Sequence, residues 1–463
     1  MTYTVSRPLV AAALAAVTLT GCTLGPDYSR PPVTTPDTFR GDASADTTRS
    51  FGDEPWANVF QDEALRQLIT EALAGNYSVR IAATRVLQAA AQLGITRADQ
   101  LPTITGQINT TGQHGAIFGG TQIPTIGVVQ ASIGMSWELD FWGRYRRATE
   151  AARAELEATE WCRRAIVTSL VTEVASQYYV LRALDLEYEN VTRTLAAREE
   201  SLRLTQIREQ GGAAPLVDVR QAEQLVLGAR GQITDVLRRI SQVEHALSLL
   251  LGRPPGPIAR GQALIAQTHA PVVPAGLPSS LLERRPDVRQ AELQLAAATA
   301  RIGVAEALRF PQIGLTASGG VASTSLGDLL TSGTWSVGGS LVQPILNAGR
   351  NRSRVALAEA QAEEATLVYQ ATVLQSLREV SDALVAYERR REARETQEAL
   401  VVAATDARRL ADLRYRGGAT SYLEVLDSDT RLFIAELGLV QSQLSELTAF
   451  VDVYRALGGG WQS

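Results

Sequence analysis

The chain has no lysine, so every basic side chain in its 463 residues is an arginine. A Walker-type phosphate loop, a Schiff-base lysine and a protein-kinase site each require a lysine amine, and all three are excluded. The histidines, His114, His245 and His269, are far apart and lack metal-ligand spacing, so we interpret them as unrelated surface or packing residues. Because these constellations are missing, the sequence predicts no enzyme activity, no cofactor and no bound metal.

The chain also lacks a large excess of positive or negative charge. The formal net charge is only −5 at pH 7, and this mild acidity gives no footprint for nucleic-acid binding. Cysteine is limited to Cys22 and Cys162. If Cys22 is modified, Cys162 has no disulfide partner, and we expect it to pack as a small apolar residue in a helix.

An apolar run near the N-terminus, from Leu9 to Leu19, is too short to span a bilayer. Together with Arg7 ahead of it, the run predicts a secretory signal peptide over residues 1–21. It ends in the sequence LTGC, which is similar to the lipobox of bacterial lipoproteins, where the cysteine thiolate is acylated. We therefore predict a lipid anchor on Cys22, with an ordinary signal peptide and an incidental cysteine as the alternative.

Thr23, and not aspartate, follows this cysteine, which by similarity to other lipoproteins implies sorting to the outer membrane. The residues up to position 55 are rich in proline, threonine, aspartate and serine and lack apolar periodicity, so we expect an extended arm. The predicted divisions are a signal peptide (1–21), a lipidated N-terminal arm (22–55), a first repeat (56–252), a connector rich in proline and glycine (253–278), a second repeat (279–458) and a tail (459–463).

The two repeats align with each other by eye. Four segments of the first match four of the second: Asn76–Arg80 with Arg285–Arg289, Leu93-Gly94 with Ile302-Gly303, Leu101-Pro102 with Phe310-Pro311, and Gly143-Arg144 with Gly349-Arg350. A repeat of roughly 200 residues is too long for a solenoid and indicates a duplicated module. Each copy is predicted to contain a helix, two strands joined by a loop, and two long helices joined by a turn.

Four segments alternate apolar and polar residues with the period of a β-strand: 103–111, 130–141, 312–321 and 335–341. The clearest places Ala131, Ile133, Met135, Trp137, Leu139 and Phe141 on one face. A tilted strand needs roughly 9–11 residues to cross a bilayer, and an apolar outer face with a polar inner face is typical of a membrane barrel. A half-buried sheet in a soluble domain is the alternative.

An aromatic cluster, Trp137, Phe141 and Trp142, lies where the second strand leads into a helix. It is suited to an aromatic girdle at the inner membrane interface, although packing in a soluble core is also compatible with it. Four strands cannot close a barrel, and an open sheet edge cannot face lipid. Two, three or four copies of the chain are therefore expected to share one barrel.

The helical segments 143–210 and 349–416 contain no proline, and each is roughly 100 Å long at ~1.5 Å per residue. Apolar residues recur in them every three to four positions, as in coiled coils. We expect these helices to fold back onto 214–251 and 421–457, and shorter helices to span 77–99 and 286–308. The glycine pairs at the turns, Gly211-Gly212 and Gly417-Gly418, are expected to supply positive φ angles.

The motif LGPDYSRP, at 24–31, is followed by Phe39, Pro55-Trp56 and Phe60-Gln61-Asp62. With the lipobox and the repeat, these residues make the chain resemble the TolC-like outer-membrane efflux factors of Gram-negative bacteria, in their lipoprotein (NodT-type) branch. The resemblance extends from the lipobox to near Gly458.

The resemblance implies a mostly helical chain that forms a homotrimer, with a 12-stranded β-barrel of four strands per chain continued by a periplasmic α-helical barrel. It implies a passive duct in the outer membrane that exports drugs or other small toxic compounds. The implied partners are a periplasmic adaptor protein, an inner-membrane pump of the RND type and outer-membrane lipid. Peptide or protein secretion of type I and heavy-metal efflux are alternatives, and a structural coiled-coil lipoprotein of the periplasm is a remote one.

The resemblance also places a gate at Leu423, Glu424 and Asp427, and adaptor contacts at the glycine turns. Some family members have an arginine at the position of Thr420, so we expect Arg414 or Arg416 to provide any ion pair there. The alternative is that both acids are solvated first-turn residues that favour the helix dipole.

Overall fold

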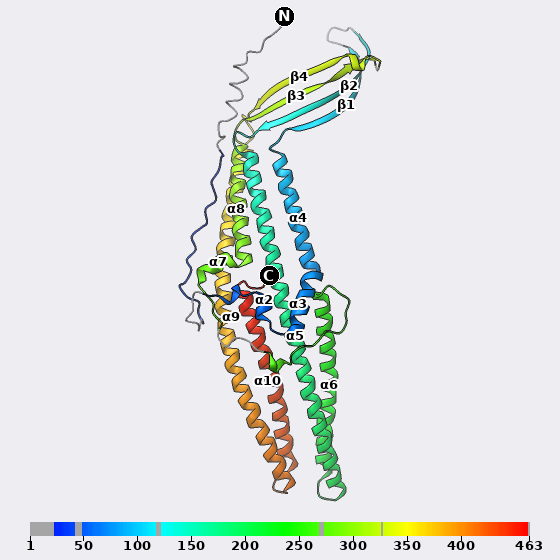
Figure 1. Cartoon of the computed structure of the whole chain (residues 1–463), viewed down its shortest axis with the longest axis vertical. Coiled ribbons are helices and arrows are strands. Elements are labelled where there is room, and N and C mark those ends of the chain that lie inside the picture. The colour runs from blue at the N-terminus through cyan, green and yellow to red at the C-terminus, as the bar shows by residue number, and fades with distance from the viewer. Residues whose placement is uncertain (1–22, 42–48, 117–121, 268–272, 326, 462–463) are drawn as a thin grey trace. The chain divides into compact units, whose positions relative to one another are not determined.

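The computed structural model describes residues 23–41, 49–116, 122–267, 273–325 and 327–461, without the side chains over 113–126 (Figure 1). The predicted signal peptide, Cys22 and His269 lie outside the described residues, as does the side chain of His114.

The same order of elements occurs twice: a helix, two strands and a long helical hairpin. The first copy contains α4 (Tyr77–Ala98), β1 (Thr103–Ala116), β2 (Gln122–Leu139), α5 (Arg144–Gln210) and α6 (Leu216–Leu250). The second contains α8 (Pro286–Ala307), β3 (Gln312–Ser323), β4 (Gly333–Val342), α9 (Arg350–Arg416) and α10 (Tyr422–Ala456). Corresponding helices have 22, 67 and 35 residues in both copies. The six predicted helices are confirmed.

Two strand predictions were wrong in their bounds. The first hairpin is longer than expected, because the pairing of β1 with β2 continues to Ala116 and Gln122. The second strand ends at Leu139 and does not include Phe141. The amide of Phe141 donates to the carbonyl of Leu139 (3.0 Å), and Gly143 has a φ of 76°, so the chain turns here before α5 begins.

The described residues also include the shorter α-helices α2 (Trp56–Val59), α3 (Glu63–Gly75) and α7 (Leu281–Arg284). The sequence analysis missed α3. This helix begins at Asp62, whose carboxylate accepts from the amide of Ala64 (2.9 Å), and it ends at Asn76. The Asn76 side chain in turn accepts from the amide of Ser78 at 2.8 Å, so one residue both separates α3 from α4 and caps α4.

The chain divides into two compact units, each described here by itself. Unit 1 comprises Met1–Pro32, Arg85–Glu160 and Gln290–Gln370 and contains the antiparallel sheet, in the order β1-β2-β3-β4. In this unit α8 packs on α5 and on α9 through small side chains. The residues are Ala297 and Ala300 with Ala151 and Ala154, and Ala298, Ile302 and Ala305 with Val355, Ala358 and Ala362.

Unit 2 comprises Val33–Thr84, Trp161–Arg289 and Ala371–Ser463 and holds the largest apolar core. Its centre is aromatic: Tyr454 of α10 is fully buried, and its ring lies 5.2 Å from that of Phe51 and 6.0 Å from that of Phe60. The segment that precedes α3 is thereby packed against the last helix of the chain.

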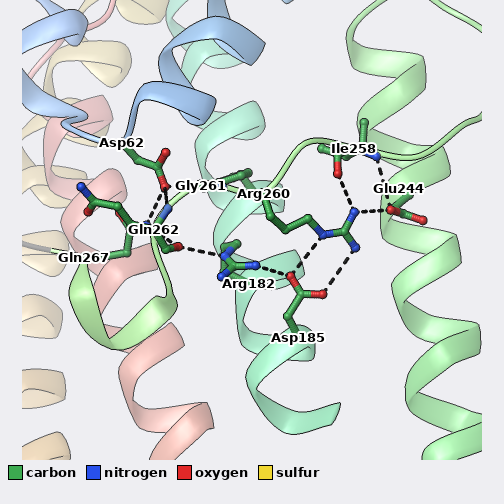
Figure 2. A network of polar contacts seen from close by, with 10 residues as sticks. Asp62, Arg182, Asp185, Glu244, Ile258, Arg260, Gly261, Gln262 and Gln267 are labelled. Carbon is green, nitrogen blue, oxygen red and sulfur yellow. Dashed lines mark hydrogen bonds and ion pairs between the residues drawn. The ribbon is translucent and has the colours of Figure 1, made fainter. Parts of the chain in front are cut away.

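The connector between the repeats is held in unit 2 by a polar network (Figure 2). One carboxylate oxygen of Asp62 accepts from the Tyr178 hydroxyl (2.8 Å), the Gln262 amide (2.9 Å) and the Gln267 side chain (2.8 Å). Just before these residues in the connector, Arg260 pairs with Asp185 on α5 and Glu244 on α6. The connector therefore bridges both helices of the first hairpin and the start of α3.

Burial raises the pKa of Asp62, but the hydrogen bonds from Gln267, Tyr178 and two backbone amides outweigh burial, so the pKa lies below its ordinary value. Gly261 of the connector approaches this carboxylate so closely that a Cβ there would lie 2.0 Å from its Oδ1 atom. A side chain at this position would therefore displace the Asp62 carboxylate.

Candidate functional site

The sheet of unit 1 has one apolar face. Directly opposite residues of an antiparallel pair share a face, and the register pairs Ile104 with Met135, Ala131 with Val321, and Ala317 with Val337. The apolar residues of this face are Ile104, Ile108, Val129, Ala131, Ile133, Met135, Trp137, Leu139, Ile313, Leu315, Ala317, Val321, Trp335, Val337 and Leu341. Several of these side chains are widely exposed in the single chain, with Ile108 at 77% and Trp335 at 82%.

The opposite face of the sheet is polar. The register pairs Thr103 with Ser136 and Ser318 with Ser336, and the last two hydroxyls lie 2.8 Å apart. Most of the remaining side chains on this face are small or polar, among them Thr105, Gln107, Asn109, Gln130, Ser132, Glu138, Thr316 and Ser340, whereas Val128 and Val342 are apolar exceptions. The predicted alternation of the four strands is thus confirmed, and it runs through all four strands in register.

The two outer strands of the sheet are β1 and β4, and within the described residues each pairs with a strand on one side only. β4 is exposed along its whole length. An unpaired strand edge presents free backbone donors and acceptors, so both edges are able to pair with further strands.

The predicted aromatic cluster is divided between the sheet and the turn after it. Trp137 lies on β2 and donates its indole N–H to the Gln100 carbonyl (3.0 Å). Trp142 lies in the turn, donates to the Pro311 carbonyl (2.7 Å) and stacks on Phe310 with ring centroids 4.8 Å apart. Sequence reasoning missed Phe310 as a partner, although the repeat alignment had marked Phe310-Pro311.

The two helical turns of unit 2 have the same hydrogen-bond pattern. Gly211 and Gly417 still donate to the carbonyls four residues earlier (both 3.0 Å). Only the second glycine of each pair, Gly212 or Gly418, has a positive φ, and both angles are 74°. The expectation that both glycines of a pair adopt positive φ was therefore wrong, because the first one completes the last helical turn.

Each predicted gate acid has an arginine partner in the same chain. Glu424 accepts from Arg414 across the turn (2.9 Å) and also from the Thr420 hydroxyl. Asp427 accepts from Arg431 one turn later on α10, at 2.7 Å. Leu423 beside them is 59% exposed. The expected Arg414 pair is therefore present, and Arg416 pairs elsewhere.

A second ion-pair cluster near these turns was missed by the sequence analysis. Asp429 on α10 accepts from Arg198 on α5 (2.9 Å) and from Arg408 on α9 (3.3 Å). The Arg198 guanidinium is almost fully buried and lies 4.9 Å from the centre of the Phe433 ring. This cluster joins the two hairpins of one chain. Asp429 comes only two residues after Asp427, and this spacing places it on another face of the helix.

Aromatic contacts add to this connection between the hairpins. The Tyr422 hydroxyl on α10 lies 3.2 Å from the Ser201 hydroxyl on α5, and the Arg208 guanidinium lies 4.4 Å from the centre of the Tyr415 ring on α9.

The acid at the first turn, Asp218, is partly shielded from water, and this burial raises its pKa above the ordinary value.

Other features bear on the chemistry of the chain. Among the described residues, no group of three or more His, Cys, Asp or Glu side chains is placed to hold a metal ion. Cys162 is a half-buried free thiol on α5. None of the helices in the described ranges combines the length and apolarity required to cross a membrane.

Comparison with known proteins gives a consistent result. The outer membrane efflux protein family matches residues 68–253 and 277–459. The antibiotic efflux pump outer membrane protein ArpC of Pseudomonas putida is 36% identical over 98% of this chain and 96% of its own length. The cation efflux system protein CusC of Escherichia coli is 32% identical over 96% of this chain and 97% of its own length.

Among solved structures, the outer-membrane channel OprN superposes with a TM-score of 0.89 at 30% identity, covering 96% of this chain and 100% of its own. The relatives thus span nearly the whole sequence, and both they and the family match include the sheet and both helical turns. The chain therefore belongs to the outer membrane efflux protein family.

Proposed function

We propose that this protein works as a homotrimer and forms the passive exit duct of a tripartite efflux system that exports drugs or other small toxic compounds. In this proposal three chains contribute four strands each to a closed 12-stranded barrel in the outer membrane. The helical hairpins continue the barrel into the periplasm. The observation that carries the proposal is the four-stranded sheet with one apolar face, one polar face and two unpaired edges.

The two unpaired edges of the sheet are the reason that several copies of the chain are needed. In lipid, each unpaired backbone group costs several kcal/mol, so a sheet that enters a bilayer must close on itself. Four strands are too few for closure by one chain. Pairing of β4 of one copy with β1 of the next satisfies both edges, puts the apolar face toward lipid and leaves the polar face around water.

The helices of unit 1 support the same assembly. Leu87 and Ile95 of α4 are 70% and 59% exposed, and Leu357 and Leu367 of α9 are 57% and 59% exposed. Exposed apolar side chains at regular helical spacing are typical of interfaces that another chain covers. We propose that neighbouring copies cover these faces.

The duct is proposed to be gated at Leu423, Glu424 and Asp427, and to open when a periplasmic adaptor contacts the turns at Gly211, Gly212, Gly417 and Gly418. An inner-membrane pump, of the RND type, then drives cargo into the duct. The ion pairs of Glu424 with Arg414 and of Asp427 with Arg431 support this proposal, because they neutralise acids that would otherwise repel one another around a narrow opening.

A lipid on Cys22 is proposed to anchor the chain to the outer membrane, with Trp137, Phe141 and Trp142 at the membrane interface. The polar tips of the two tryptophans are already hydrogen-bonded, while their rings remain half-buried, as suits an interfacial position. Cation export is a second candidate for the cargo, favoured by the similarity to CusC over nearly the whole chain.

The gate is tested by the double variant Leu423→Ala/Asp427→Ala in planar bilayers and in cells. We expect a higher single-channel conductance and entry of large antibiotics that the native protein keeps out. The matched control is Asp452→Ala, which removes another exposed acid of α10 paired with an arginine, Arg455, at 3.0 Å. Unchanged conductance and unchanged antibiotic entry in the double variant would show that the gate lies elsewhere.

A further inference from the structure

The N-terminal arm of unit 1 lies in a groove whose charges and glycines complement those of the arm. Arg147 at the start of α5 is 3% exposed, and its guanidinium bonds both to Glu150 of the same helix (2.8 Å) and to the arm. It donates to the Leu24 carbonyl (3.0 Å), the Gly25 carbonyl (3.1 Å) and the Asp27 carboxylate (2.7 Å). A buried guanidinium is costly unless all its donors are satisfied, and here the arm satisfies most of them.

A second pair holds the arm six residues after Leu24. Arg30 forms a two-pronged ion pair with Glu292 of α8, at 2.7 and 2.9 Å, and the Tyr28 hydroxyl donates to the same carboxylate at 3.1 Å. Glu292 is 5% exposed. Two buried charges of opposite sign, on two different helices, thus recognise opposite charges of one extended segment.

The backbone of the arm approaches the helices too closely for side chains. A Cβ on Gly303 would lie 2.4 Å from the Leu24 carbonyl oxygen, and a Cβ on Gly25 would lie 2.4 Å from the Gly303 Cα. A Cβ on Gly143 would similarly lie 2.9 Å from the Cα of Thr23. The groove therefore excludes side chains at three points where the arm passes.

The internal repeat provides a comparison within the chain. The counterparts of Gly143 and Gly303 are Gly349 and Gly94, and a Cβ on either would meet nothing within 4 Å. The counterparts of Arg147 and Glu292 are Ser353 and Ala83, which carry no charge. The glycines recur at the corresponding repeat positions, but the two charged residues occur only at the positions that contact the arm.

We propose that Gly143, Arg147, Glu292 and Gly303 form a binding site for the arm segment Thr23–Arg30, and that Arg147 and Glu292 are its positioning residues. The amide of Leu24 donates to the Trp142 carbonyl at 3.2 Å, and Trp142 stacks on Phe310, which precedes β3. The docked arm thus fixes Thr23, the residue after the lipidation cysteine, at the junction of the sheet with the helices. This role for the anchor rests on the lipid proposed above, whereas the docking of the arm does not.

Chymotrypsin provides the test, because it cleaves after Tyr28 only when the arm leaves the groove. The full-length protein is digested in detergent, and mass spectrometry follows the released peptide that ends at Tyr28. We expect slow cleavage of the native protein and cleavage at least about tenfold faster in Arg147→Ala and Gly303→Ala, since each loses or blocks charged hydrogen bonds. Gly94→Ala, the repeat counterpart, should cleave at the native rate.

Reversing the charges of one ion pair distinguishes loss of arm binding from a general loss of folding. Arg30→Glu alone should expose the cleavage site, and Arg30→Glu/Glu292→Arg should restore protection. Equal cleavage of the native protein, Arg147→Ala and Gly303→Ala would overturn the proposed groove, as would a failure of the reversed pair to protect the arm. Incorporation of labelled palmitate at Cys22 is measured separately. Absence of the label would remove the role of the anchor, while the cleavage rates still decide the groove.

Discussion

Arg198 on α5 and Asp429 on α10 form a nearly buried ion pair, with the guanidinium 2.9 Å from the carboxylate, and this pair joins the two helical hairpins of one chain. Arg408 on α9 donates to the same carboxylate. Three of the four long helices therefore meet at one side chain near the turns. A change in the relative position of the hairpins has to break or stretch this contact.

Removing the charge of Asp429 should loosen the hairpins. Asp429→Asn leaves the nearly buried Arg198 without a counter-charge, whereas Arg408 keeps Asp412 at 3.7 Å, and loss of buried charged hydrogen bonds costs about 2–3 kcal/mol. We expect faster amide exchange at the turns and a larger open fraction in single-channel recordings. Asp406→Asn, which removes an exposed acid of α9 paired with Arg409, is the control and should change neither. Native-like recordings from Asp429→Asn would contradict a role of this pair in holding the hairpins.

The Asp62 network should fail in acid. Because the folded-state pKa of Asp62 lies below its unfolded value of about 3.9, its contribution to stability is present above pH 3.9 and is lost as the pH falls through the folded pKa. Asp62→Asn has one acceptor oxygen where the carboxylate has two, so it should loosen the connector at every pH. Amide exchange at Gln262, which donates to Asp62, measures the effect. Equal protection of this amide in the variant and the native protein at pH 7 would contradict the prediction.

The turns should respond differently to alanine at the two glycines of each pair. Gly212→Ala and Gly418→Ala force a left-handed conformation on alanine, which costs about 1–2 kcal/mol. No atom lies within 4 Å of the added Cβ, so the cost is conformational and not steric. Gly211→Ala and Gly417→Ala replace residues that complete a helical turn and should be neutral or slightly stabilising. Thermal unfolding compares the four variants, and equal midpoints would argue against this division of roles.

The two faces of the sheet should differ in their tolerance of charge. Val337 lies on the apolar face and its neighbour Ser336 on the polar face. An arginine on the lipid face of a barrel costs about 2–4 kcal/mol near the middle of the bilayer, so Val337→Arg should reduce assembly in the outer membrane. Ser336→Arg should assemble and change the conductance. Equal assembly of both variants would mean that the apolar face does not contact lipid.

Much of the fold could be predicted because its signals are local. The long helices follow from about 68 residues without proline and from a glycine pair at the turn of each hairpin, and the strands follow from period-two alternation. The helix α3 had a signal too, because Leu65, Leu68, Ile69 and Ala72 have helical spacing and are buried. This signal is hard to separate from that of α4, because Asn76 alone lies between the two helices.

The site could be predicted only where its partners are close in sequence. Arg414 and Glu424 are ten residues apart across one turn, so their pairing could be expected. Arg198 and Asp429 are 231 residues apart, and Arg30 and Glu292 are 262 apart. No local periodicity records such pairs, because they depend on which helices become neighbours after folding.

The number of chains in the particle that conducts ions in planar bilayers is the most direct measurement of the central claim. We predict three chains per particle, with the outer-edge amides of β1 and β4 protected from exchange by strands of neighbouring copies. A stable single chain that conducts ions, or that keeps its sheet folded in water without detergent, would contradict the account.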